Sequence, residues 1–84
     1  MLLAVVEGSV VTTVKHPSLK GWKVLIVQPL DFRGRADGDP ILAIDGLGAG
    51  RGVKVVISND GRGTREMIGD EHSPVRWSVI GIVD

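Results

Sequence analysis

Five apolar runs, separated by glycine, proline and polar residues, are distributed along a chain of only 84 residues. The runs are rich in Val and Ile, which favour strands, and 12 glycines punctuate them. Strands are expected over residues 3–14, 22–30, 41–45, 53–58 and 77–83. Gly8 falls within the first run, where a glycine usually marks a bulge or a bend. Because too little chain remains for crossover helices, residues 1–84 are predicted to form one all-β domain.

One short helix is also expected, over residues 64–68, with Thr64 as its cap and Gly69 as its stop. Five strands and one short helix predict a small five-stranded, OB-like antiparallel β-barrel. Closure of the barrel would remove the free sheet edges that otherwise promote aggregation. Pro29 is expected at a position where the strand ladder requires no N–H donor.

The size of the chain raises the question of what stabilises it. A domain of this length buries only about 60–65% of the surface of its unfolded chain. Such small domains usually depend on disulfides, a metal ion or oligomerisation. The sequence has no cysteine, and its mean hydropathy is +0.20, which is high for a small monomer. Oligomerisation is therefore the expected source of additional stability.

Composition excludes several classes of protein. Without cysteine the chain is neither a disulfide-stapled scaffold nor a cysteine-ligated zinc module. Its 10 basic and 10 acidic side chains balance, which argues against a dedicated nucleic-acid binder. No apolar run approaches the roughly 20 residues of a membrane span. Glu7 interrupts the apolar start and no basic residue precedes it, unlike a signal peptide, so a cytoplasmic location without a membrane partner is expected.

The glycine-rich segment 46–52 does not match a phosphate-binding loop. Lys54 is preceded and followed by valine, so the Gly-Lys-Ser/Thr end of a Walker A loop is missing. Arg51 stands where the dinucleotide pattern needs its third glycine, and no long helix follows. The favoured interpretation is that these glycines permit positive φ angles and close backbone approach, within the protomer or in an assembly.

Other candidate chemical groups are isolated. His16 and His72 each adjoin a turn, and no paired spacing such as H-x-x-x-H accompanies them. No serine lies in a G-x-S-x-G elbow. Asp37 and Asp39 share a polar loop and are expected to solubilise it rather than to act as a catalytic pair. The sequence therefore predicts no enzyme activity, no cofactor and no metal site.

Binding of single-stranded nucleic acid is the alternative from another functional class. OB-like barrels can hold a single strand of DNA or RNA in a basic groove, with its bases stacked on aromatic side chains. The aromatic residues are only Trp22, Phe32 and Trp77. Basic residues from Arg51 onward are interleaved with acidic ones rather than gathered in a stripe. Nucleic acid is thus an unfavoured partner, and the tryptophans are better suited to a core edge or a subunit interface.

Several stretches in order along the chain resemble the EutN/CcmL family of bacterial microcompartment shell vertex proteins. They are Gly8-Ser9-Val10-Val11-Thr12-Thr13-Val14-Lys15-His16-Pro17-Ser18-Leu19, Gly21-Trp22-Lys23-Val24-Leu25-Ile26-Val27-Gln28-Pro29-Leu30-Asp31, Asp45-Gly46-Leu47-Gly48-Ala49-Gly50-Arg51-Gly52, Pro74-Val75 and Val79-Ile80-Gly81-Ile82-Val83-Asp84. The resemblance covers essentially the whole chain. The chain departs from the family at residues 58–65, which are bulkier and more charged, and at Arg76 and Trp77, where Asp and a small residue are usual.

The resemblance implies a β-barrel protomer that forms a homopentamer. Such pentamers would cap the fivefold vertices of an icosahedral shell whose facets are built from hexameric shell proteins of another family. The ring would close through a heterologous interface. Gly48, Ala49 and Gly50 are expected to allow close backbone approach within or between protomers. His16 and Pro17 are expected to meet neighbouring shell tiles.

Overall fold

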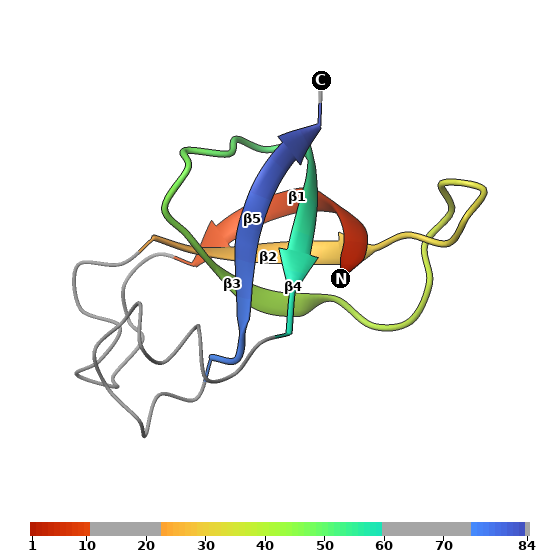
Figure 1. The fold of residues 1–84 in the computed structure, drawn as a ribbon, viewed down its shortest axis with the longest axis horizontal. Coiled ribbons are helices and arrows are strands. Elements are labelled where there is room, and N and C mark those ends of the chain that lie inside the picture. The colour runs from red at the N-terminus through yellow and green to blue at the C-terminus, as the bar shows by residue number, and fades with distance from the viewer. Residues whose placement is uncertain (11–22, 60–74, 84) are drawn as a thin grey trace.

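The computed structural model describes residues 1–10, 23–59 and 75–83 (Figure 1). The expected helix over 64–68 lies outside the described residues, as do Trp22 and His72. So do His16 and Pro17, two of the predicted assembly residues. Among the described residues, no helix is long and apolar enough to cross a membrane.

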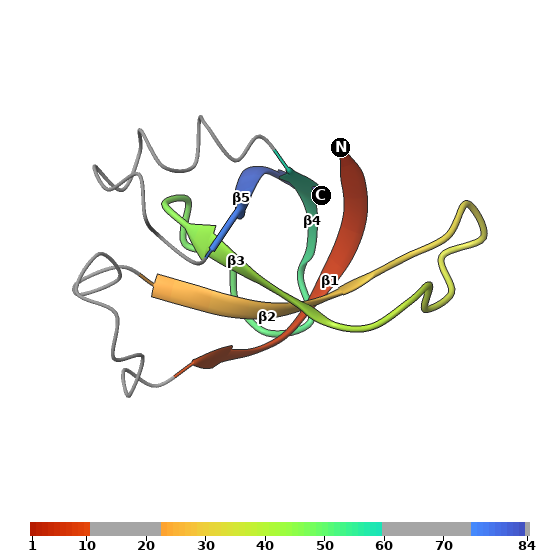
Figure 2. The same ribbon diagram turned by 90° about the horizontal axis from the view of Figure 1, so that it is seen from below.

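Five strands form the fold: β1 (Leu2–Val10), β2 (Lys23–Pro29), β3 (Ile41–Asp45), β4 (Lys54–Ser58) and β5 (Trp77–Val83). They close into a barrel in the order β1-β2-β3-β5-β4 (Figures 1 and 2). The predicted all-β, five-stranded barrel is confirmed. The bounds predicted for β3 and β5 agree with those found.

One strand pair differs from the expected antiparallel pattern. The β3 and β5 strands run parallel, and they are joined through only two residue pairs, Ala43 with Trp77 and Ile44 with Ser78. The other neighbouring strands in the barrel are antiparallel. The reason is geometric: an odd number of strands cannot alternate in direction all the way around a closed ring. One pair must therefore be parallel, and in this barrel it is the pair of strands with the fewest paired residues.

A break in register bends β1. The β1–β2 pairing shifts between Val6 and Gly8, which confirms the irregularity predicted at Gly8. Before the break, residues Leu2–Val5 of β1 also pair with β4. After it, residues 8–10 pair with β2 alone. The bulge thus separates β1 from β4 and opens one end of the barrel.

Pro29 ends β2 at a buried position opposite Ala4. Its carbonyl oxygen accepts a hydrogen bond from the Asp37 backbone N–H at 2.9 Å. The next residue, Leu30, donates its own N–H to the Leu3 carbonyl at 2.8 Å. The ladder between β1 and the end of β2 therefore continues through a residue that has a donor.

The barrel interior is filled by small and medium apolar side chains. Its main cluster consists of Ala4, Val6, Leu25, Val27, Ala43, Ala49, Val55, Ile57 and Val79. All but Ala49 lie on strands, and Ala49 comes from the segment between β3 and β4. Trp77 is partly buried against this cluster, at the edge of the core.

Candidate assembly site

The segment that follows β3 is organised around one buried carboxylate. Asp45 is the last residue of β3, and its side chain has no exposed surface. Its Oδ1 accepts the backbone N–H groups of Leu47 at 2.7 Å and Gly48 at 3.2 Å. Its Oδ2 accepts the N–H of Ala49 at 2.8 Å. Hydrogen bonds to an ionised acceptor are stronger than neutral ones, so this carboxylate holds three successive residues in place.

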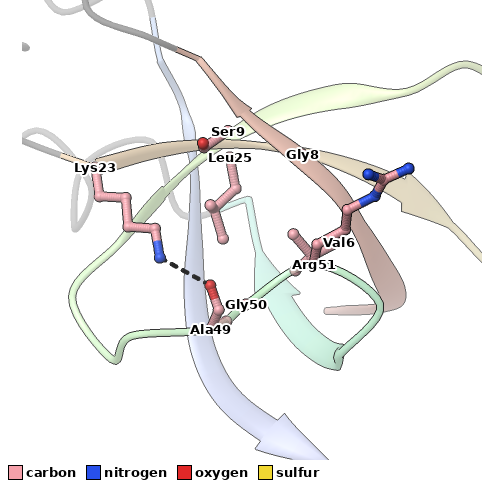
Figure 3. A pocket seen from close by; sticks show the side chains of 8 residues that line it. All are labelled: Val6, Gly8, Ser9, Lys23, Leu25, Ala49, Gly50 and Arg51. Atoms are coloured by element: carbon pink, nitrogen blue, oxygen red, sulfur yellow. Dashed lines mark hydrogen bonds between the residues drawn. The ribbon is translucent and has the colours of Figure 1, made fainter.

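A lysine from the neighbouring strand completes the arrangement. Lys23 lies directly opposite Asp45 in the β2–β3 pair. Its Nζ donates to the Ala49 carbonyl oxygen at 2.9 Å (Figure 3) and lies 3.9 Å from Asp45 Oδ2. The buried carboxylate thus has a counter-charge, as buried charges generally require. The Ala49 backbone is held from both sides, by Asp45 at its N–H and by Lys23 at its carbonyl.

These contacts fix the position of Ala49 at the end of the barrel. Ala49 is 1% exposed and packs in the main core cluster, whereas Gly48 and Gly50 on either side are exposed. Gly48 has a φ of 84° and Gly52 a φ of 83°, a backbone conformation that side chains with a Cβ disfavour. The prediction that glycines of this segment provide positive φ angles is confirmed at these two positions.

Gly50 differs from its glycine neighbours. It is not among the residues with positive φ, and no atom of the described residues lies within 4 Å of where a Cβ would stand. The described part of the protomer therefore does not explain the absence of a side chain there. Close approach within the protomer is not found at Gly48 or Gly50 among these residues, and close approach between protomers stays a prediction.

An open hollow of about 170 Å³ lies beside this segment (Figure 3). The hollow forms because β1 no longer pairs with β4 after the bulge, whereas the segment after β3 is hydrogen-bonded to β1 just before the bulge. These hydrogen bonds run from the Gly52 N–H to the Val6 carbonyl at 2.8 Å and from the Val6 N–H to the Val53 carbonyl at 2.9 Å. The hollow is lined by Val6, Gly8, Ser9, Lys23, Leu25, Ala49, Gly50 and Arg51.

The described residues that line the hollow do not form a reaction centre. None of them is a carboxylate, histidine or cysteine, and their two cationic side chains do not converge. The Lys23 ammonium group is engaged with Ala49, and the Arg51 guanidinium points away from it (Figure 3). Across residues 1–10, 23–59 and 75–83, no group of three or more His, Cys, Asp or Glu side chains could hold a metal ion. The hollow is a recess in shape, suited to contact rather than to chemistry.

The structure brings three of the five predicted assembly residues together. Ala49 and Gly50 line the hollow and Gly48 precedes them in the same segment, whereas His16 and Pro17 lie outside the described residues. Sequence reasoning missed Asp45 and Lys23. Asp45 carried a signal, because an aspartate before a glycine at the end of a strand commonly accepts hydrogen bonds from the following backbone. Lys23 carried none, because its contact depends on the register of two strands.

Comparison with known proteins decides the family. A family model described as "Ethanolamine utilisation protein EutN/carboxysome" matches residues 1–84. The chain belongs to the EutN/CcmL family. The resemblance found in its sequence is thereby confirmed over the full length of the chain.

Individual members agree in sequence and in fold. The bacterial microcompartment shell vertex protein EutN of Salmonella typhimurium is 45% identical over 84 residues, which span 100% of this chain and 84% of that protein. The solved structure of Gloeobacter violaceus CcmL has a TM-score of 0.84 at 39% identity, covering 100% of this chain and 86% of that one. The pentameric microcompartment shell protein GrpN of Rhodospirillum rubrum gives a TM-score of 0.81 at 39% identity, with 100% and 94% covered. Members of this family are structural shell vertex proteins and not enzymes.

Proposed function

We propose that this chain forms a homopentamer that occupies the fivefold vertices of a bacterial microcompartment shell in the cytoplasm. The observation that carries the proposal is its full-length match to shell vertex proteins, together with the shared fold of the pentameric GrpN. The role is geometric. Hexagonal tiles alone make a flat layer, and a closed icosahedral shell needs fivefold points, so the vertex protein needs a defined ring and no reactive group.

Hexameric shell proteins on the facets are the proposed neighbours of this pentamer. The support is the vertex role of the relatives and the geometric need for sixfold tiles around each fivefold point. His16 and Pro17 are proposed to meet those tiles, on the strength of the family resemblance in their stretch of sequence. The test is to mix the purified chain with a hexameric shell protein and to image the products by electron microscopy. Closed particles support the proposal, and sheets indistinguishable from those of the hexamer alone contradict it.

The oligomeric state is tested by native mass spectrometry across a range of protein concentrations. The expected mass is that of five 8.9 kDa protomers. A monomer at every concentration would overturn the vertex function and leave only the shared fold. A mixture that shifts toward the pentamer with concentration supports the proposal, because mass action then drives assembly.

Residues 48–50 are proposed to contact the neighbouring protomer in this ring. Asp45 and Lys23 hold these residues rigidly, and Gly50 faces open space in the described part of the protomer. A rigid surface without a side chain allows the close approach of another backbone.

Gly50→Leu is a sharp test of that contact. The leucine meets no atom of the described residues within 4 Å of its Cβ and needs no positive φ, so the protomer should still fold. We expect a circular dichroism spectrum like that of wild type and a loss of the pentamer. Asp39→Leu, which adds the same side chain to the exposed 31–40 loop, should leave the pentamer intact. A Gly50→Leu pentamer as stable as wild type would exclude close approach at this residue.

Binding of single-stranded nucleic acid is not favoured, because the relatives are shell vertex proteins. Among the described residues the aromatic side chains are Phe32 and Trp77, and the latter packs against the core. The Arg33 guanidinium lies 5.3 Å from the centre of the Phe32 ring. Of the described aromatic side chains only Phe32 is exposed, and one exposed ring does not make the series of stacking platforms that such binders use.

A further inference from the structure

Among the described strands, none pairs with one edge of the second half of β5. On one side, β5 pairs with β4 as far as Val83, which lies opposite Lys54. On the other side it pairs with β3 only through Trp77 and Ser78. Beyond these, β3 ends at Asp45 and the chain turns away to cross the end of the barrel toward β4 (Figure 1). From Val79 onward, no described strand lies along this edge of β5.

The same stretch of β5 exposes large apolar side chains. Ile80 is 49% exposed, Ile82 42% and Val83 40%. Gly81 lies between Ile80 and Ile82, opposite Val56 of β4. No charged residue occurs in the strand Trp77–Val83. In the pairing with β4, Ile82 lies opposite Val55 and Val83 opposite Lys54, so their side chains point to different faces of the strand. We call Ile80, Ile82 and Val83 the β5 edge patch, because all three lie on the stretch of β5 that has no second strand partner among the described residues.

Other exposed apolar residues of the described chain do not form such a patch. Phe32 lies in the 31–40 loop, which projects from the barrel away from β5 (Figures 1 and 2). The others are spread over separate elements: Met1 and Leu2 at the start of the chain, Leu42 on β3 and Leu47 in the segment after β3. Single exposed apolar residues are ordinary on protein surfaces, whereas an apolar edge strand invites association and is normally covered.

We propose that the β5 edge patch is buried against the next copy of this chain in the ring. This inference rests on the proposed pentamer. A closed ring of five uses a heterologous contact, in which two different surfaces of the protomer meet. The hollow beside Gly50 lies between β1, β2 and the segment after β3. In the strand order β1-β2-β3-β5-β4, β5 lies across the barrel from the seam of β1 and β2.

The two surfaces are therefore placed to form the two halves of such a contact. The β5 edge patch supplies exposed apolar side chains on a strand without charged residues, and the centres of interfaces are likewise depleted of charged residues. An exposed strand edge can also add hydrogen bonds from its backbone to a neighbouring chain. The hollow supplies a recess beside a glycine. The occupant of the β5 edge patch is thus a second copy of this chain.

Thiol labelling tests this burial without disturbing the fold. The chain has no cysteine, so a single introduced cysteine is the only thiol. Val83→Cys and Leu2→Cys replace residues that are each 40% exposed in the protomer. Cysteine behaves as a small apolar residue close in size to valine, so Val83→Cys should still assemble. Native mass spectrometry of each variant confirms its oligomeric state before labelling with a maleimide.

In the pentamer, the thiol of Val83→Cys should react at least about tenfold more slowly than the thiol of Leu2→Cys, because labelling requires an accessible thiolate. Dilution to the monomer should bring the two rates together. Equal rates within an intact pentamer would overturn the burial of the β5 edge patch while leaving the vertex function in place. A wild-type protein that is monomeric at every concentration would instead overturn the vertex function itself.

A charge placed in the patch gives a second, independent readout. Ile82→Lys should raise the protein concentration at half-assembly at least about tenfold, because a buried, unpaired charge is costly at an interface. Phe32→Lys is the control, since Phe32 is 93% exposed in a loop that projects away from β5. Both variants should keep the circular dichroism spectrum of the folded barrel. An Ile82→Lys pentamer with unchanged concentration dependence contradicts the inference.

Discussion

Asp45 shows how one side chain can decide the shape of a functional segment. Its carboxylate is buried, accepts three backbone N–H groups, and is balanced by Lys23 from the next strand. All buried side-chain polar atoms of the described residues have a partner, so this charge is satisfied rather than reactive. The carboxylate therefore serves to hold Ala49 and its flanking glycines in a fixed position, which is what a contact surface needs.

Replacing this carboxylate should destabilise the protein. Asp45→Ala leaves the N–H groups of Leu47, Gly48 and Ala49 without their acceptor, and it leaves Lys23 without its counter-charge. We expect a loss of about 2–4 kcal/mol in the free energy of unfolding per protomer, measured by urea denaturation at a fixed protein concentration. Asp39→Ala, in the exposed loop, should change it by less than about 0.5 kcal/mol. A similarly small effect at Asp45 would mean that the segment holds its shape without the carboxylate.

The strands themselves follow closely from local sequence. β3 is bounded by Pro40 and Gly46, residues that interrupt a strand ladder, and its predicted bounds agree with the structure. The bend at Gly8 was likewise visible in the sequence. These features depend only on neighbours along the chain, and such features are the ones that composition and spacing can reveal.

The pairing of strands was harder to predict. The parallel β3–β5 seam follows from the closure of five strands, not from any residue in either strand. The contact of Lys23 with Ala49 spans 26 positions and exists because Lys23 is in register with Asp45. Both are products of register and topology, which depend on the whole sheet. The glycine-rich segment was recognised from its sequence, whereas the residues that hold it in place were not.

β4 offers a direct test of how its two faces contribute to stability. Ile57 is fully buried in the core, whereas the adjacent Val56 points to the other face and is only partly buried. Ile57→Ala should cost about 2–5 kcal/mol, because it removes apolar contacts and leaves a cavity that the small barrel cannot fill. Val56→Ala should cost less than half as much, measured by the same urea denaturation. Equal losses at the two positions would contradict the register that places Val55 and Ile57 inside.

The described part of the protomer combines a small core with an apolar strand edge that pairs with no described strand. Among these residues the main cluster holds nine buried side chains, three of them alanine and four valine, and the largest fully buried ones include leucine and isoleucine but no aromatic residue. No disulfide adds to this, because the sequence lacks cysteine. The β5 edge patch remains exposed on the isolated chain. Association would bury that surface, so assembly and folding stability should be coupled.

This coupling predicts that thermal stability depends on protein concentration. If five folded protomers associate and the unfolded chains do not, tenfold dilution should weaken the folded state by about 1 kcal/mol per protomer through mass action. For a domain of this size, that change lowers Tm by about 4–8 °C. Calorimetry or circular dichroism melts over a hundredfold range of concentration will measure the shift. Gly50→Leu, if it prevents assembly, should have a Tm that is lower than that of wild type and independent of concentration. A concentration-independent Tm for a wild-type pentamer would show instead that the isolated protomer is already stable. Assembly would then set the geometry of the ring without adding to the stability of the fold.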